Sequence, residues 1–506
     1  MKFFFAWVCY SVLAFLFCIS ANAQRINQYS VETGTLFSSS QTPFWLRANQ
    51  YGIIPLKNPA LRLNAKVYSD YKVADSIGHK AIVDWGYGLN VVTNIGATNQ
   101  VVIPEMYVKG RLGAFEIYAG RRRELIGLVD TLLTSGSYIW SGNSLPFPKI
   151  QVSLPAFTSV PFTSGIVSIM GTFSHGWFEN ANRLVKGSYL HQSSFYGRLG
   201  KPSWRVKLYG GANHQVMWAG HSDYLDPTVA ANGQLPSGIK YFPAVVLGTQ
   251  NPFPGDQTIQ TISRFEENRI GNHLGSIDLA VEVNSTHWNL FAYRQFVYDD
   301  GSLFYGTNLD DGLNGLRIRN NHQPGRPAFF LRQITVEYLF TGSQGGDVFI
   351  LEDPQRRGRD DYFNNAQYLD GWTYFGRTVG TPFLTPQQEV NPSLPPHYGI
   401  ANNRVSAFHV GLSALVCNKV DIMSRLSLSR NAGTYAVPYL RVPSQFSGLI
   451  TASLPISLLG GTVLTGSLAV DSGGLLPNSV GGYISLRKTG VLNRKRPTVN
   501  STDKYF

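Results

Sequence analysis

Cysteine is scarce in this chain, which has three among its 506 residues. Two of them lie within the first 23 residues, so Cys417 is the only cysteine in the remainder of the sequence. A lone cysteine excludes an intramolecular disulfide bond. The fold of this part must therefore be stabilised by packing and by hydrogen bonds.

The start of the chain has the pattern of a secretory signal. Lys2 gives it a basic end, residues 3–19 form an apolar run, and small residues follow in an A-x-A pattern that ends at Ala23. An uncleaved anchoring helix is the weaker alternative, because the run is barely of bilayer length. We predict that residues 1–23 are a cleaved signal peptide and that residues 24–506 form a single exported domain.

Acidic residues are outnumbered, with 31 Asp and Glu against 43 Lys and Arg. Removal of residues 1–23 takes away one charged residue, Lys2, and lowers the formal net charge from +12 to +11. In an exported protein such a balance indicates an anionic partner in the cell envelope, such as lipopolysaccharide, an acidic glycan or the membrane surface. It favours these partners over nucleic acid.

Several catalytic signatures are missing from the sequence, including H-E-x-x-H, C-x-x-C, G-x-S-x-G and the Walker lysine loop. We therefore predict a protein that is not an enzyme and that uses no cofactor or metal. A lipid or ester hydrolase remains an alternative, because catalytic groups meet in space and not in sequence. His409 and Ser413, which share one face of a predicted strand, are the residues that such an activity would use.

Long apolar runs are also missing after the start, whereas glycine (51 residues) and aromatic residues (13%) are plentiful. Apolar and polar side chains alternate instead, as they do in strands with one face toward lipid and one toward water. The alternating segments are residues 61–71, 81–91, 276–283, 406–414, 421–429 and 478–488. This pattern predicts an all-β fold, a transmembrane antiparallel β-barrel. A propeller is disfavoured, since the sequence has no fixed internal repeat.

Residues 449–470 contain no charge and have the length of a membrane helix. Pro455 and the pair Gly460-Gly461 favour two strands joined at the glycines. Long segments rich in glycine, proline and asparagine separate other strands, at residues 133–164, 204–256, 353–396 and 431–443. In a barrel they are either extracellular loops or inward folds that plug the lumen.

The strongest candidate for a carbohydrate-binding site is the run Arg121, Arg122, Arg123 and Glu124. Guanidinium groups suit planar anions, so arginines at a strand end can hold the uronate or phosphate groups of a glycan. The alternative is an ion-pair network with Glu124 and Asp130 that braces the lumen.

Tyr138, Trp140 and Lys149 form a second candidate, because two aromatic residues stand among small polar ones. Aromatic rings can match the apolar faces of sugars, and short polar side chains can match their hydroxyl edges. An aromatic belt at the membrane interface explains the same pattern.

Two further segments mix charges of both signs with aromatic residues. In residues 264–273, which include Arg269 and His273, a catalytic carboxylate pair is disfavoured because neighbours on a strand face opposite sides. A salt-bridge network is the alternative there. In residues 356–374 we single out Asp361 and Trp372, as parts of a binding or plug loop, or of a solvated loop whose charges cancel.

Residues 42–52, with the sequence TPFWLRANQYG, resemble the opening segment of the Wzi-like capsule assembly proteins of the Bacteroides group. Further stretches resemble that family in the same order, at residues 121–123, 141–150, 268–275 and 361–365. The resemblance implies an outer-membrane barrel of about 18 strands that binds capsular polysaccharide and organises it at the cell surface. The charged residues 493–496 depart from a barrel that ends on its last strand.

We therefore expect a lectin-like outer-membrane protein whose partners are an acidic capsular polysaccharide, membrane lipid and lipopolysaccharide. A channel for small solutes, with arginines along its pore, is the first alternative. The barrel hydrolase is the second.

Overall fold

A computed structural model describes residues 26–72, 81–225, 230–249, 253, 269–299, 303, 305–322, 325, 328–350 and 358–492. The predicted signal peptide, the basic tail at residues 493–496, and residues 264–268 and 356–357 of the two charged segments lie outside this part of the chain.

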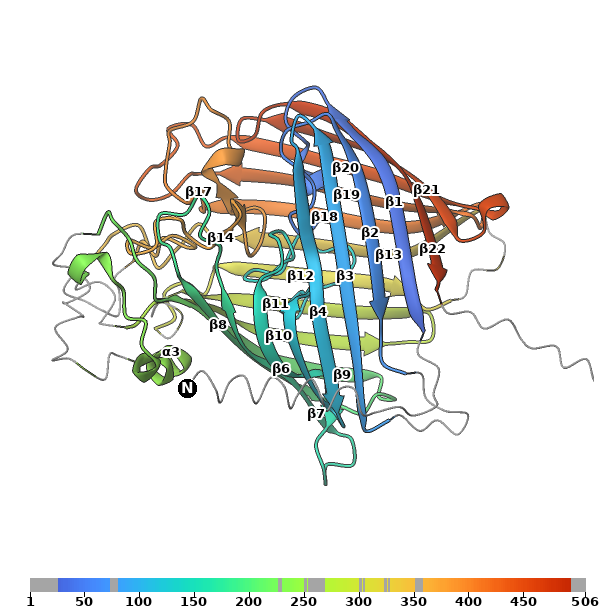
Figure 1. Cartoon of the computed structure of the whole chain (residues 1–506), viewed down its shortest axis with the longest axis horizontal. Helices are drawn as coiled ribbons and strands as arrows, with labels where there is room; N and C mark the ends of the chain where they lie inside the picture. Colours follow the sequence, from blue (N-terminus) through green and yellow to red (C-terminus); the bar gives the residue numbers. More distant parts are fainter. Residues whose placement is uncertain are drawn as a thin grey trace, which may run out of the picture.

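Within it, eighteen strands form one closed antiparallel barrel (Figure 1). The strands are β1 (Asn27–Ser38), β2 (Ala60–Ser69), β3 (Val83–Gly96), β4 (Gln100–Leu112), β5 (Phe115–Arg121), β6 (Pro148–Ser159), β7 (Val167–Trp177), β8 (Tyr189–Leu199), β9 (Val206–Trp218), β10 (Asn272–Asn284), β11 (Trp288–Asp299), β12 (Gly312–Asn320), β13 (Phe329–Phe340), β18 (Val405–Val416), β19 (Val420–Asn431), β20 (Ser444–Ile456), β21 (Thr462–Gly473) and β22 (Ser479–Val491). Each pairs with the next along the chain, and β1 pairs with β22 to close the barrel. The predicted all-β antiparallel barrel is confirmed.

The remaining elements are short. They are α2 (Phe44–Arg47), α3 (Phe242–Leu247), the small strands β14 (Thr373–Tyr374), β15 (Arg377–Thr378), β16 (Thr385–Pro386) and β17 (Ile400–Asn402), and 3-10 turns at Ala231–Gly233, Ile239–Tyr241, Gln387–Glu389 and Ser457–Leu459. None of the helices in the described ranges is long and apolar enough to cross a membrane.

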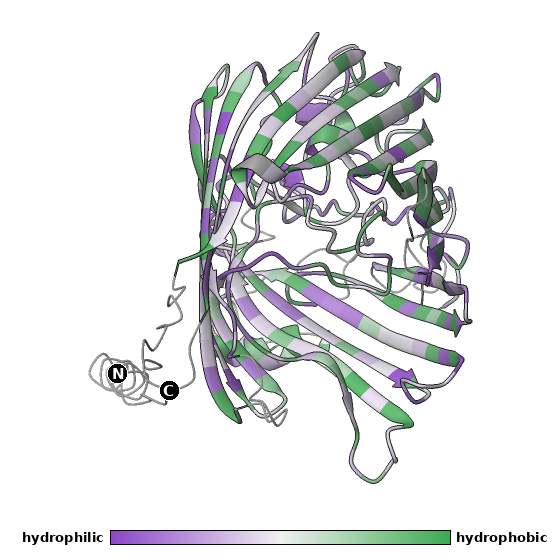
Figure 2. Cartoon of the chain, turned by 90° about the vertical axis from the view of Figure 1, so that its right-hand side faces the viewer, coloured by the Kyte–Doolittle hydropathy of each residue, from purple (hydrophilic) through white to green (hydrophobic). Residues whose placement is uncertain are grey.

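The alternation in the sequence sets which side chains face out. On β10, Ile277 and Leu279 point outward and are 45% and 51% exposed, whereas Asp278 between them is fully buried in the lumen. Figure 2 shows the same alternation of apolar and polar residues along many strands. Because successive side chains lie on opposite faces of a strand, one sequence period separates an apolar outer surface from a polar interior.

Two of the predicted loops are partly wrong, because each contains a strand. β6 lies within residues 133–164 and β9 within residues 204–256. Prolines at both ends of the alternating part of β6, and the pair Gly210-Gly211 within β9, obscured the strand pattern. The prediction for residues 449–470 is confirmed, since β20 ends before Gly460-Gly461 and β21 begins after them.

Three long connections fold into the lumen as a plug, which confirms the inward alternative for the parts of residues 133–164 and 353–396 that they contain; the first of the three was not predicted. They are residues 39–59, 122–147 and 358–404, and carboxylates of the barrel wall accept their backbone N–H groups. Asp278 accepts from Leu128 (2.9 Å) and Asp471 accepts from Phe44 (2.8 Å). Such bonds satisfy loop backbone that would otherwise be buried without partners.

The plug fills one half of the lumen. On β1, the inward Leu36 near the plug is 2% exposed. Toward the chain ends, the inward side chains of Glu32 and Lys66 are 12% and 28% exposed. We call these regions the plug half and the terminus half, since Gln28 and Val491 pair at the end of the latter.

Candidate functional site

A cavity of about 1180 Å³ lies between the plug and the barrel wall. It is bounded by the first plug segment, by the start of β4 and the end of β5, and by the hairpin β14–β15. Its lining includes Lys57, Arg121, Tyr374, Arg377 and Glu389. We call it the side cavity.

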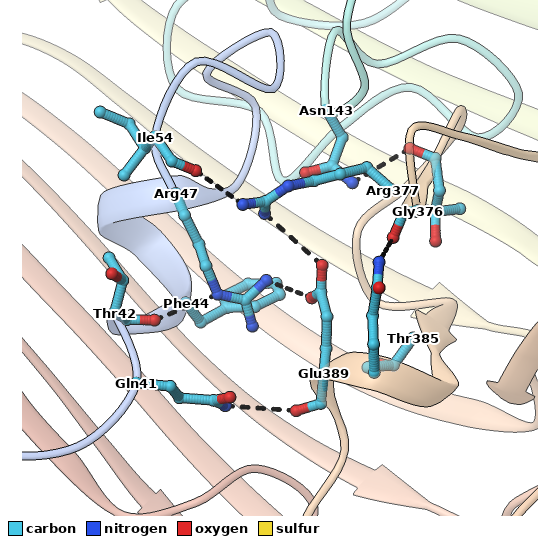
Figure 3. Close-up of polar contacts among 12 residues, drawn as sticks. Gln41, Thr42, Phe44, Arg47, Ile54, Asn143, Gly376, Arg377, Thr385 and Glu389 are labelled. Atoms are coloured by element: carbon cyan, nitrogen blue, oxygen red, sulfur yellow. Dashed lines mark hydrogen bonds and ion pairs between the residues drawn. The ribbon is translucent and has the colours of Figure 1, made fainter. Parts of the chain in front are cut away.

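Arg377 and Glu389 on the inner side of the cavity belong to a charged clamp, whose contacts Figure 3 shows. The carboxylate of Glu389 pairs with Arg47 through one oxygen and with Arg377 through the other, at 3.5 Å for Arg377. The side chains of all three residues are no more than 9% exposed. Burial lowers the pKa of Arg377 to about 10, although Glu389 opposes this effect. Two guanidinium groups share one carboxylate, so the clamp carries excess positive charge.

The clamp joins the first and third plug segments, and Asn143 beside it adds a bond from the second (Figure 3). Arg377 donates to the carbonyl oxygen of Ile54 (2.7 Å) in the first segment. Asn143 of the second segment donates to the carbonyl oxygen of Thr378 (3.0 Å) in the third. Gln41 donates to the backbone of Glu389 (3.2 Å). Side chains far apart in sequence thus fix one inner wall of the cavity.

Arg121, the last residue of β5, faces this clamp across the hairpin. Its guanidinium donates to the hydroxyl of Tyr374 (3.0 Å) and lies 5.9 Å from the ring centres of both Tyr374 and Phe375. Among the ion pairs of the described residues, none joins Arg121 to a carboxylate. The predicted binding residue therefore brings an uncompensated positive charge and two aromatic rings to one cavity.

The next predicted residues lie in an ion-pair ladder instead. Arg122 pairs with Glu116 (2.5 Å) and with Glu124 (3.1 Å), and Lys149 pairs with Glu124 (2.6 Å). Burial opposes the ionisation of Glu124, but Lys149 and Arg122 outweigh it and hold the pKa of this carboxyl below its ordinary value. The structure thus contains the ion-pair network that was the alternative for these residues.

Arg123 continues the ladder, donating to Asn90 (2.8 Å) and lying 3.6 Å from Glu105. Asp130 was also expected in this network. It instead accepts from Leu133 (2.7 Å) within the plug and from Gln333 (2.9 Å) on the wall. Its role is to hold a plug turn against β13.

The predicted aromatic residues lie inside the plug. Tyr138 and Trp372 are fully buried and Trp140 is 5% exposed. Asp361, in the third plug segment, accepts from Asn403 (2.6 Å). Their packing holds the plug together, and a direct contact of any of them with sugar stays a prediction.

Arg269 and His273 lie at the start of β10, which does not neighbour β5 in the barrel. His273 is 4% exposed and lies 2.9 Å from a ring nitrogen of His214. Arg269 is half-buried. The structure therefore separates this pair from the side cavity, and glycan binding by it also stays a prediction.

The predicted hydrolase residues are packed under the plug. His409 is 1% exposed, its Nε2 donates to the carbonyl oxygen of Leu133 (2.8 Å), and its Nδ1 lies 2.8 Å from Ser427 Oγ. The structure thus pairs His409 with Ser427 and not with Ser413. Over the described ranges, no group of three His, Cys, Asp or Glu residues is arranged to hold a metal ion.

The three clamp residues were not predicted as site residues from the sequence. Arg47 lies within residues 42–52, where the family resemblance begins, so that segment held a signal for it. Arg377 and Glu389 stand alone in a long loop. Only the folded plug brings them together.

No family model and no curated protein sequence matches the chain. Among solved structures the chain is similar to Wzi of Escherichia coli, an outer membrane protein involved in group 1 capsule assembly and a carbohydrate-binding β-barrel. The TM-score is 0.57 at 12% identity, over 90% of this chain and 83% of that one. OccK3 of Pseudomonas aeruginosa gives 0.44 at 8% identity, over 93% and 96% of the two chains. A BenF-like porin from Pseudomonas fluorescens gives 0.43 at 8% identity, over 93% and 99%. What the chain shares with Wzi at this identity is the barrel fold.

Proposed function

We propose that this chain is an outer-membrane protein that binds an acidic capsular polysaccharide and helps its assembly or attachment at the cell surface, without catalysing a reaction. The observation that carries this proposal is Arg121, a cation without a carboxylate partner among the described residues, beside two aromatic rings in the side cavity. The apolar outer face of the barrel and the pattern of residues 1–23 support the outer membrane as its location.

The chemistry of the side cavity suits an acidic sugar. Arg121 and Lys57 add positive charge to that of the clamp, and Phe375, which is 49% exposed, offers a ring surface. Tyr374 is buried and holds Arg121 through its hydroxyl. Guanidinium groups bind carboxylates and phosphates, and aromatic rings pack on the apolar faces of sugar rings. A volume of about 1180 Å³ is large enough for several sugar units.

The fold shared with Wzi supports the same function, because Wzi is itself a carbohydrate-binding barrel involved in capsule assembly. The plug supports binding over conduction. Its three segments fill half of the lumen with buried side chains, such as Trp45 and Tyr138. Planar-bilayer recordings separate the two functions: we expect little current from the wild-type protein, and a large steady current would favour the channel.

Loop lengths support an orientation. Most connections at the plug end are long, with residues 97–99 and 474–478 as short exceptions, and most of those at the terminus end are short, such as residues 113–114 and 417–419. Outer-membrane barrels have short periplasmic turns and long extracellular loops. The plug half then faces the cell exterior, where capsule is held.

The cellular test compares surface-attached with released capsular polysaccharide in a strain that lacks the gene, complemented with wild type or with Arg121→Gln. Arg122 and Arg123 are left unchanged, because both belong to the ion-pair ladder and their loss would disturb the wall. Arg332→Gln is the control, since it removes one charge from an exposed pair in the terminus half. We expect deletion and Arg121→Gln to release capsule and Arg332→Gln to retain it. Unchanged attachment on deletion would refute the proposal.

A further inference from the structure

The barrel wall has a notch beside the side cavity. β5 has 7 residues and its neighbour β4 has 13, while β6 begins at Pro148, opposite the end of β5. Arg121 at the end of β5 lies opposite Met106, so residues 100–105 of β4 continue beyond it. Over this length of roughly 20 Å, no described strand pairs with the side of β4 that faces β5. We call this opening the notch.

β4 is suited to an open edge at this point. Its register with β3 shifts between Asn90 and Val92, opposite Pro104. Proline has no N–H to donate to a neighbouring strand, and bulges are frequent at sheet edges and beside functional sites. Two features therefore favour the notch: the proline and register shift of β4, and the short length of β5.

The tip of the plug hairpin β14–β15 reaches the notch. Phe375 is 49% exposed, and its backbone N–H donates to Glu179 (2.8 Å) in the connection after β7. Tyr374 next to it holds Arg121. The hairpin thus connects the interior of the plug with the connection after β7.

The mouth of the side cavity is apolar on its outer side. Val101 is 67% exposed and Met106 is 54% exposed, and both line the cavity. Met106 pairs with Leu89, whose side chain belongs to the outward apolar surface of β3. The apolar residues on the outer side of the cavity mouth therefore lie beside Arg121, which pairs with Met106 across the two strands.

We infer that the notch is a lateral port that holds an anionic glycolipid of the outer leaflet. Its acidic sugar head group contacts Arg121 in the side cavity, and its acyl chains stay in the membrane against Val101 and Met106. This inference rests on the proposed function and adds to it the lipid-linked form of the glycan. A free polymer needs the cations of the cavity, but only an acyl chain uses an apolar mouth that opens toward lipid.

The test places a photo-reactive phenylalanine analogue at position 375 of the full-length protein in capsule-producing cells. The same analogue at Phe195 on β8, an outward residue that is 60% exposed, is the matched control. We expect capture of a sugar-bearing lipid at position 375 and of bulk phospholipid alone at position 195. Capture at position 375 should fall about tenfold when Arg121→Gln is added, because a charge-assisted contact is lost.

Capture of the same phospholipid at both positions would overturn the lateral port. Capture of acidic polymer without lipid at position 375 would overturn it too, while leaving the proposed glycan binding intact. The capsule-release test above judges the proposed function separately, since it does not depend on where the lipid lies.

Discussion

The two halves of the lumen use the same residue types for different purposes. In the plug half, the Arg47–Glu389 pair is 1% and 4% exposed and ties separate plug segments together. In the terminus half, the Arg332–Asp421 pair is 42% and 47% exposed and faces water. Buried charges must keep their partners, whereas exposed pairs contribute little to stability. The Arg47–Glu389 pair therefore fixes the plug beside the side cavity, whereas the Arg332–Asp421 pair stays exposed.

The largest expected effect comes from the packing of the plug half. Trp45 is fully buried, and its indole N–H donates to Ser427 (3.1 Å). We expect Trp45→Ala to lower the free energy of unfolding by about 3–5 kcal/mol, measured by urea titration in detergent with circular dichroism. Trp288→Ala, at an outward position that is 40% exposed, is the control and should cost much less. Equal losses would contradict a packed plug.

A smaller effect is expected from the clamp. Glu389→Gln removes the charge that Arg47 and Arg377 share, and should cost about 2–3 kcal/mol in the free energy of unfolding. Asp421→Asn, which removes the charge of an exposed pair, should cost less than about 1 kcal/mol. The same urea titration measures both variants. A larger loss for Asp421→Asn would reverse the comparison between the halves.

The smallest expected effect is the change that added salt makes to the coupling energy of an ion pair. Raising the ionic strength from about 0.1 M to about 1 M shortens the screening length from about 10 Å to about 3 Å. Double-mutant cycles should show that the coupling energy of Arg332 with Asp421 falls toward zero, while that of Arg47 with Glu389 is retained. Equal salt responses would indicate that water reaches the clamp.

The strands were predictable because their burial has a period of two. Residues 276–283 and 406–414 show it in sequence, and both lie in observed strands. The plug has no such period. Its residues meet partners more than a hundred positions away, as Leu128 meets Asp278. The general idea of a plug could be predicted from loop length and composition, but not its contacts.

The site was predictable only in part. Arg121 was chosen for its charge and its place at a strand end, and it does line the side cavity. Arg122 and Glu124 were chosen as site residues on the same grounds as Arg121. They pair with each other in the ladder instead, because β5 ends at Arg121 and the next residues turn into the lumen. Glu389 had no local signal, since its chemistry depends on two arginines from other segments.

The most direct test of the account is the affinity of the purified protein for its native acidic capsular polysaccharide, measured by calorimetry for wild type, Arg121→Gln and Arg332→Gln. The account predicts binding that weakens as salt is raised, an affinity about tenfold lower for Arg121→Gln, and no change for Arg332→Gln. Equal affinities for all three proteins, or binding that is insensitive to salt, would contradict the claim that Arg121 and the side cavity hold the glycan.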